Sequence, residues 1–206
     1  MTPLGSLLKY SAAVPDGKLI AGVLAASLGY AVVRYNVFGG VSADQLPVFV
    51  TNKAISVGSL VLLGVSRVVI DKPRRKHLGL IGLALALLHV MLSLLVLQPT
   101  YLAKLYLADG KMQWFGELSM LTGAIATVLL LWLAYATTTR PLQDQRPGSS
   151  LLPSVGRIVL ALVAAHNLLL GASVWMNPAG WPGGLPPITL LSFVIATGLC
   201  VLPKSR

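Results

Sequence analysis

The stretch RRKHLGLIGLALALLHVMLSLL, from Arg74 to Leu95, decides the fold of this chain. It opens with a run of basic residues and then becomes almost wholly apolar. A helix needs about 20 apolar residues to cross a hydrocarbon layer ~30 Å thick. The run contains one histidine, His89, and an ionisable residue inside a membrane helix is costly and usually functional. The stretch therefore predicts a membrane-spanning helix that carries an imidazole in its interior.

The rest of the chain has the same character. Hydrophobic residues make up 55% and charged residues 11% of the 206 residues, whereas soluble domains carry about 25% charged residues. The mean hydropathy of +0.79 likewise excludes an ordinary soluble domain. We expect a single all-α domain, an integral membrane bundle of six transmembrane helices, preceded by a cytoplasmic lead at residues 1–17. The six predicted spans are Leu19–Phe38, Ala54–Ile70, His77–Leu97, Leu118–Ala136, Leu151–Met176 and Pro187–Leu202.

Topology accounts for the net charge of +10. Twelve of the 16 lysines and arginines fall near the two termini and in the connections that follow spans 2 and 4. The remaining four lie on the opposite side of the predicted bundle, and they are Arg34, Lys53, Lys104 and Lys111. Because cytoplasmic loops carry an excess of Lys and Arg, both termini are predicted to be cytoplasmic. No anionic partner is then needed to explain the charge, and the expected partners include membrane lipids but no nucleic acid.

The connections on the opposite side carry two further predictions. Arg34, near the end of the first span, is expected to snorkel to the membrane interface, and the segment GGVSADQLPVFVTNK that follows is expected to be a loop. In the connection after span 3, four bulky residues recur at helical spacing and predict a short interfacial helix. These four residues are Tyr101, Leu102, Leu105 and Tyr106.

Two histidines are the candidate chemical residues. Spans 3 and 5 enter from the same side, so they are expected to run parallel. His89 lies 12 residues after His77, or about 18 Å along a helix, and His166 lies 9 residues after Arg157, or about 14 Å. The two imidazoles are therefore expected at a similar depth. His77 lies at the cytoplasmic mouth of span 3 and is interpreted as an interfacial residue.

Two interpretations of the histidine pair stay open. In the first, both imidazoles are axial ligands of a b-type haem. Gly82 and Ala86, on the same helix face as His89, then leave room for the porphyrin edge. In the second, each histidine bonds a Ser, a Thr or a backbone carbonyl of a neighbouring helix. The chain has one cysteine and no CxxCH motif, which excludes a covalently attached c-type haem.

Four segments of the chain, in order, carry a family resemblance. They are TNKAISVGSLVLLGVS, RRKHLGLIGLALALLH, GAIATVLLLWLAYATTT and GRIVLALVAAHNLLLG. They are similar to the second to fifth spans of the ferric reductase-like transmembrane domain family. The likeness is greatest to the haem-binding membrane subunit (MsrQ type) of the bacterial periplasmic methionine sulfoxide reductase system. The resemblance covers about residues 25–175, and none of its motifs is highly specific.

The resemblance implies an electron-transfer subunit of an oxidoreductase in the bacterial inner membrane, with His89 and His166 as ligands of one outer haem b. The second histidine pair of the family is missing, because the start of span 5 reads LLPSVGR and Arg75 occupies the position fourteen residues before His89. One haem is therefore expected rather than two. Arg75 is then a candidate to meet a haem propionate, a flavin phosphate or a lipid phosphate.

The resemblance also implies redox partners. The acceptor would be a periplasmic protein, such as a molybdenum-containing reductase. The donor would be the quinone pool or a flavin reductase, with quinone or FMN as a further cofactor. The chain has no GxGxxG motif after a strand, so it is not expected to bind NAD(P)H itself. A haem-free membrane scaffold or accessory subunit is the alternative. A small-solute carrier is a weaker one, since no internal repeat is found.

Overall fold

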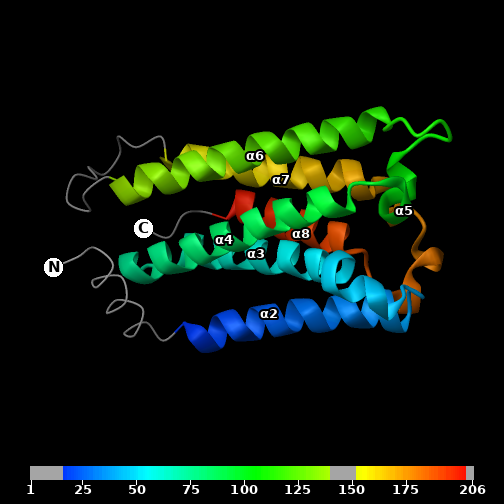
Figure 1. The fold of residues 1–206 in the computed structure, drawn as a ribbon. Helices are drawn as coiled ribbons and strands as arrows, with labels where there is room; N and C mark the ends of the chain where they lie inside the picture. The colour runs from blue at the N-terminus through cyan, green and yellow to red at the C-terminus, as the bar shows by residue number, and fades with distance from the viewer. Residues whose placement is uncertain (1–15, 140–151, 203–206) are drawn as a thin grey trace.

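A computed structural model describes residues 16–139 and 152–202 of the chain, and it confirms an all-α bundle of six long helices (Figure 1). All six are long and apolar enough to cross a membrane. The described residues contain no strand, and Tyr106 and Met112 form only an isolated antiparallel bridge. The long helices are α2 (Gly17–Val32), α3 (Thr51–Val68), α4 (Lys72–Val96), α6 (Trp114–Thr139), α7 (Leu152–Trp175) and α8 (Ile188–Val201).

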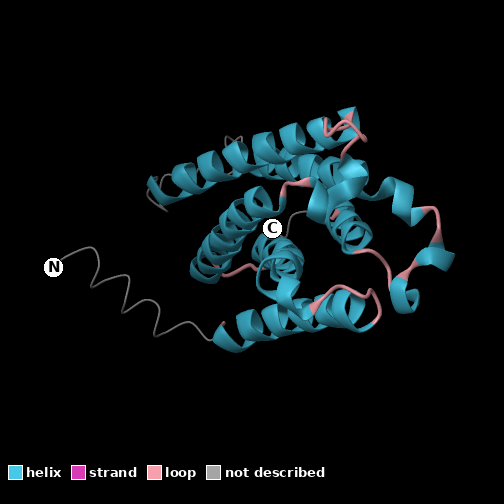
Figure 2. Ribbon diagram, turned by 45° about the vertical axis from the view of Figure 1, so that its right-hand side comes forward, coloured by secondary structure: helices cyan, strands magenta, loops and turns pink. Residues whose placement is uncertain are grey.

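Helix α3 is the central element of the bundle. It packs against α2, α4 and α8, while α7 packs against α6 and α8. Figure 2 shows that helix dominates the described residues, with loops and short helical turns between the long helices. Glycines allow the close approach that membrane helices need. A Cβ on Gly58 would lie 3.1 Å from Leu24 of α2, and a Cβ on Gly64 would lie 2.5 Å from Leu199 of α8.

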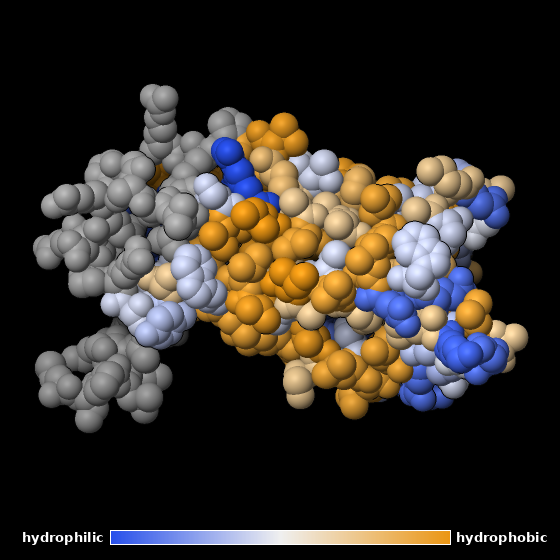
Figure 3. All heavy atoms as spheres, turned by 90° about the horizontal axis from the view of Figure 1, so that it is seen from above, coloured by the Kyte–Doolittle hydropathy of each residue, from blue (hydrophilic) through white to orange (hydrophobic). Residues whose placement is uncertain are grey.

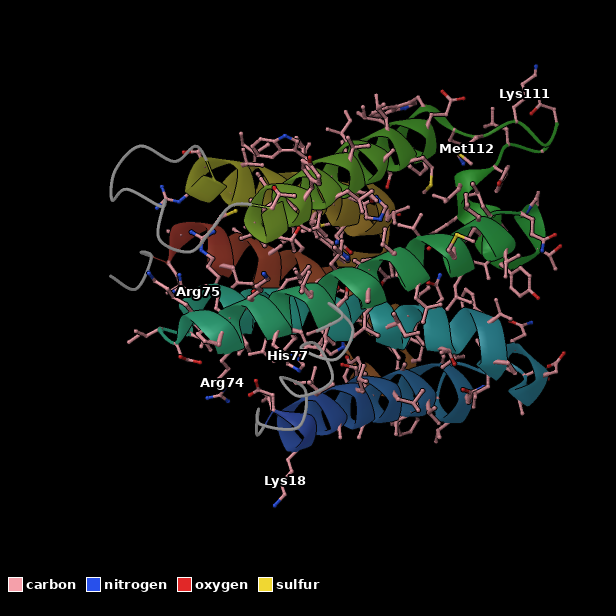
Figure 4. All side chains as sticks on the ribbon, turned by 60° about the vertical axis from the view of Figure 1, so that its left-hand side comes forward. Lys18, Arg74, Arg75, His77, Lys111 and Met112 are labelled. Atoms are coloured by element: carbon pink, nitrogen blue, oxygen red, sulfur yellow. The ribbon has the colours of Figure 1, made fainter. Side chains whose placement is uncertain are left out.

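The two ends of the bundle differ in charge. Helix α2 begins and α8 ends at the same end (Figure 1). Lys18, Arg74 and Arg75 lie at this end, which we call the basic end, whereas Lys111 lies at the opposite end beside α5 (Figure 4). We call this opposite end the α5 end. Figure 3 shows a belt of apolar side chains across the middle and hydrophilic residues gathered at the α5 end.

The basic end is held together by one buried carboxylate and one helix cap. The Asp16 carboxylate is fully buried and accepts a 2.5 Å hydrogen bond from Nε of Arg74, which ties the start of α2 to α4. The Asp71 carboxylate caps α4 by accepting a hydrogen bond from the backbone N–H of Arg74. Such a cap satisfies one of the unpaired N–H groups in the first turn.

The second span begins earlier than the sequence predicts. A 3-10 turn at Ala43–Gln45 and a π-helical turn at Leu46–Val50 lead directly into α3, so the candidate span covers Ala43–Val68. The prediction that the whole segment GGVSADQLPVFVTNK is a loop is wrong. Asn52 and Lys53 are consequently helical residues inside the span.

The connection between α4 and α6 contains the expected short helix. Helix α5 (Pro99–Leu102) continues into a 3-10 turn at Ala103–Leu105. Leu105 is fully buried, so this turn packs onto the bundle. A tight turn follows at Gly110, whose φ of +81° is a backbone conformation that glycine adopts without strain.

Arg34 does not snorkel to the membrane interface. It lies in the π-helical segment Val33–Val37 after α2, and only 4% of its surface is exposed. Its Nη1 donates to the backbone carbonyl of Leu185, and the Tyr30 hydroxyl donates to the carbonyl of Pro186 at 2.6 Å. Two helix-borne donors satisfy carbonyls of the loop before α8, so the guanidinium points into the protein.

Candidate functional site

His89 of α4 is held by a side-chain amide of α3. Its Nδ1 lies 2.6 Å from Oδ1 of Asn52, which is 2% exposed. The Asn52 amide nitrogen donates to the Ser93 hydroxyl at 3.1 Å, and the Asn52 Oδ1, which only accepts hydrogen bonds, faces the imidazole. His89 therefore carries its proton on Nδ1 and has its lone pair on Nε2. Ser93 lies one turn further along α4, and its Oγ is 3.5 Å from the same nitrogen.

His166 of α7 is held by the backbone of α6. Its Nδ1 lies 2.8 Å from the carbonyl oxygen of Ser119, an atom that only accepts hydrogen bonds. This imidazole too therefore carries its proton on Nδ1. The Ser119 hydroxyl donates back to the carbonyl of His166 at 3.1 Å. Gly123, one turn along α6, makes room for the ring, because a Cβ there would lie 3.1 Å from Nδ1 of His166.

The two histidines lie on parallel helices, and each bonds an oxygen through Nδ1. Helices α4 and α7 run in the same direction, as the sequence predicts (Figure 1). Each imidazole is bonded to a neighbouring helix, His89 to α3 and His166 to α6. Across residues 16–139 and 152–202, no hydrogen bond is found to Nε2 of either ring.

Within the described residues, each histidine has one ring nitrogen without a hydrogen bond, which a metal ligand needs. Metal-bound histidines usually donate their second ring nitrogen to a carbonyl or carboxylate, which fixes the tautomer and the ring orientation. Both histidines have such a donor bond through Nδ1, and both keep the other nitrogen for a ligand. A bis-histidine haem takes its two axial nitrogens from two helices. The described residues contain no group of three or more acidic, Cys or His residues that would hold a bare metal ion.

The other predicted site residues lie elsewhere. The space beside Gly82 is filled, since a Cβ there would lie 2.8 Å from Cγ of Leu63, so this glycine serves the α3–α4 contact. Room for a porphyrin edge stays a prediction only at Ala86. Arg75 is engaged at the basic end, where its Nε donates to the carbonyl of Val69 at 2.9 Å beyond the end of α3. His77 lies at the same end and is half-buried (Figure 4).

Sequence reasoning missed the residues that orient the two imidazoles. Asn52 lies in the segment GGVSADQLPVFVTNK, which the sequence predicts to be a loop. Ser119 and Gly123 have a sequence signal, since two small residues four apart are typical of close contacts between membrane helices. Their partner on α7 follows only from the packing of the two helices. No protein-family model matches this chain, and no curated protein matches it.

Proposed function

We propose that this chain is a membrane-embedded b-type cytochrome that transfers single electrons across the membrane. One observation carries the proposal: two histidines from separate spanning helices each bond an oxygen through Nδ1, and within the described residues neither has a hydrogen bond at Nε2. Interior imidazoles without such a role would be costly in a membrane. Bound haem b would supply a one-electron couple between His89 and His166.

The chain's own residues would set the properties of that site. Asn52 and the Ser119 carbonyl hold the two rings in one tautomer and strengthen them as electron donors to a metal. Gly123 leaves room for the His166 ring beside α6, because a Cβ there would lie 3.1 Å from Nδ1 of His166. The apolar helices exclude water, which favours the less charged oxidation state of a buried redox centre.

The direction of transfer follows from the predicted topology. If the basic end is cytoplasmic, His89 lies in the outer half of the membrane, because it is seven residues from the end of α4. Electrons would then pass from a quinol or a flavin donor to an acceptor at the outer face. A bacterial inner membrane and a periplasmic molybdenum-containing reductase fit the family resemblance.

A spectroscopic experiment tests the proposal. The purified chain should give a reduced-minus-oxidised spectrum of a low-spin b-type haem, with about one haem per chain. His89→Ala and His166→Ala should each lose the haem or leave it five-coordinate. His77→Ala is the matched control, because His77 is also a histidine of α4 but lies at the basic end. Retention of a six-coordinate spectrum in both single variants would refute the ligand assignment.

A haem-free membrane scaffold is the second candidate. The observation that favours it is that each histidine already has a good hydrogen-bond partner on a neighbouring helix, as structural polar contacts in membranes do. A colourless protein that stays colourless after haem is added would support the scaffold. In that case the histidine variants should reduce stability without any spectroscopic effect.

A further inference from the structure

A cavity at the α5 end is lined by most of the basic residues on that side of the protein. It has a volume of about 290 Å³ and lies where the end of α2, the start of α3, the turn after α5 and the start of α8 meet. Three cationic and three aromatic side chains are among those that line it, namely Arg34, Lys53, Lys104, Tyr35, Phe49 and Tyr101.

The cations of this cavity lack carboxylate partners. In the described ranges, ion pairs join only Arg74 to Asp16 and Lys111 to Asp109. Nε of the buried Arg34 has no hydrogen-bond partner. No acceptor is found within residues 16–139 and 152–202 for the Lys53 ammonium, which lies 5.2 Å from the ring centre of Phe49.

Lys104 reaches the cavity from the turn after α5. Its ammonium donates to the carbonyl of Leu170 on α7 at 2.5 Å. An ammonium has three donor positions, so two remain for a ligand. Lys104 is an exposed residue of the cavity wall.

The concentration of charge is unusual for this face of a membrane protein. Basic residues are depleted on the side opposite the basic end, where the sequence places only four. Three of these four line the cavity. The fourth, Lys111, has its own counter-ion, because its ammonium lies 3.1 Å from a carboxylate oxygen of Asp109. Three neighbouring cations without counter-ions repel one another, and a bound anion would remove this cost.

We propose that this cavity binds an oxyanion, a phosphate or carboxylate, carried by an amphiphilic molecule. Arg34, Lys53 and Lys104 would hold the oxyanion, and the aromatic wall of Phe49 and Tyr101, whose rings stack at 5.9 Å, would contact the apolar remainder. Two sources have this chemistry. One is the phosphate of an anionic lipid, which is independent of the proposed function. The other is the carboxylates of haem bound at the histidines, which rests on the proposed function.

The lipid source is tested with dioleoyl phosphatidic acid and with dioleoyl glycerol, which has the same chains and no phosphate. Binding to the purified full-length chain is measured by native mass spectrometry. The Lys53→Gln/Lys104→Gln double variant should bind phosphatidic acid at least about tenfold more weakly, since two charge-assisted hydrogen bonds are lost. Dioleoyl glycerol binding should not change. Lys111→Gln is the matched control, because it removes an outer lysine that is not in the cavity.

The carboxylate source is tested with haem and haem dimethyl ester, whose propionates are blocked. The wild type should prefer haem by about tenfold, and the double variant should lose this preference. If neither porphyrin binds, the proposed function fails and the lipid comparison alone decides the oxyanion site. If the double variant does not purify as a monodisperse protein, Lys104→Gln replaces it with about a threefold expected effect, since its side chain is exposed. The proposal is overturned if the cavity variant binds every ligand that the wild type binds with the same affinity as Lys111→Gln does.

Discussion

Replacing Asn52 with leucine should show whether His89 is a haem ligand or only a structural contact between helices. Leucine has a similar size, so the change removes polar contacts without opening a large cavity. Two hydrogen bonds between α3 and α4 are lost, from Nδ1 of His89 at 2.6 Å and to the Ser93 hydroxyl at 3.1 Å. Hydrogen bonds between membrane helices contribute ~0.6 kcal/mol on average. We therefore expect the free energy of unfolding to fall by about 1–2 kcal/mol, the upper value applying if the Nδ1–H stays unpaired.

The same variant has a second, functional readout. Loss of the partner that orients a metal-bound histidine typically weakens metal binding about 10- to 100-fold. The Asn52→Leu protein should therefore bind haem with at least about tenfold lower affinity, measured by spectroscopic titration. Ser93→Ala is the control, because Ser93 lies 3.5 Å from Nδ1 of His89 and leaves the Asn52 contact in place. Stability is measured by unfolding in mixed micelles with increasing dodecyl sulfate.

One result would refute the reasoning. If Asn52→Leu loses stability but its haem affinity and spectrum equal those of the wild type, Asn52 does not orient a haem ligand. The bond to His89 would then be a structural contact between helices, as in the scaffold interpretation. A variant that loses haem affinity with unchanged stability would instead show that the polar contact contributes little to packing.

Three further outcomes are expected. Gly82→Leu should destabilise the protein by about 1–3 kcal/mol in the same unfolding assay, because the α3–α4 contact has no space for a side chain there; unchanged stability would contradict this. A reporter fused after Arg206 should be cytoplasmic and one inserted at Gly180 should be external, and both on one side would contradict six spans. Desolvation of its ammonium lowers the pKa of Lys104, so its charge, present at low pH, is lost at a lower pH than in an ordinary lysine. Phosphatidic acid binding should therefore fall as pH rises, and the fall should move to higher pH in Lys104→Arg; identical pH profiles would exclude Lys104 as a ligand.

Hydropathy alone predicts the six helices. A helix that crosses a membrane needs a long apolar run, and such a run can be found directly in the sequence. The spacing of four bulky residues predicts the short helix after α4, and the count of spans predicts that α4 and α7 run parallel. Hydropathy does not predict where α3 begins. Polar residues such as Asn52 and Lys53 are typical of a loop, but both are part of α3. Asn52 bonds Ser93 in the interior, and Lys53 lines the cavity.

The sequence by itself determined the class of the protein, the number of its spans and the two histidines that need an explanation. Tertiary structure decided what surrounds them. The partner of His89 is 37 residues away and that of His166 is 47 residues away, and the three cations of the cavity come from three separate segments. Span formation depends on the transfer of local segments from water to lipid. Polar pairing depends instead on which helix faces meet, and that is set by small residues such as Gly123 at the contacts between helices.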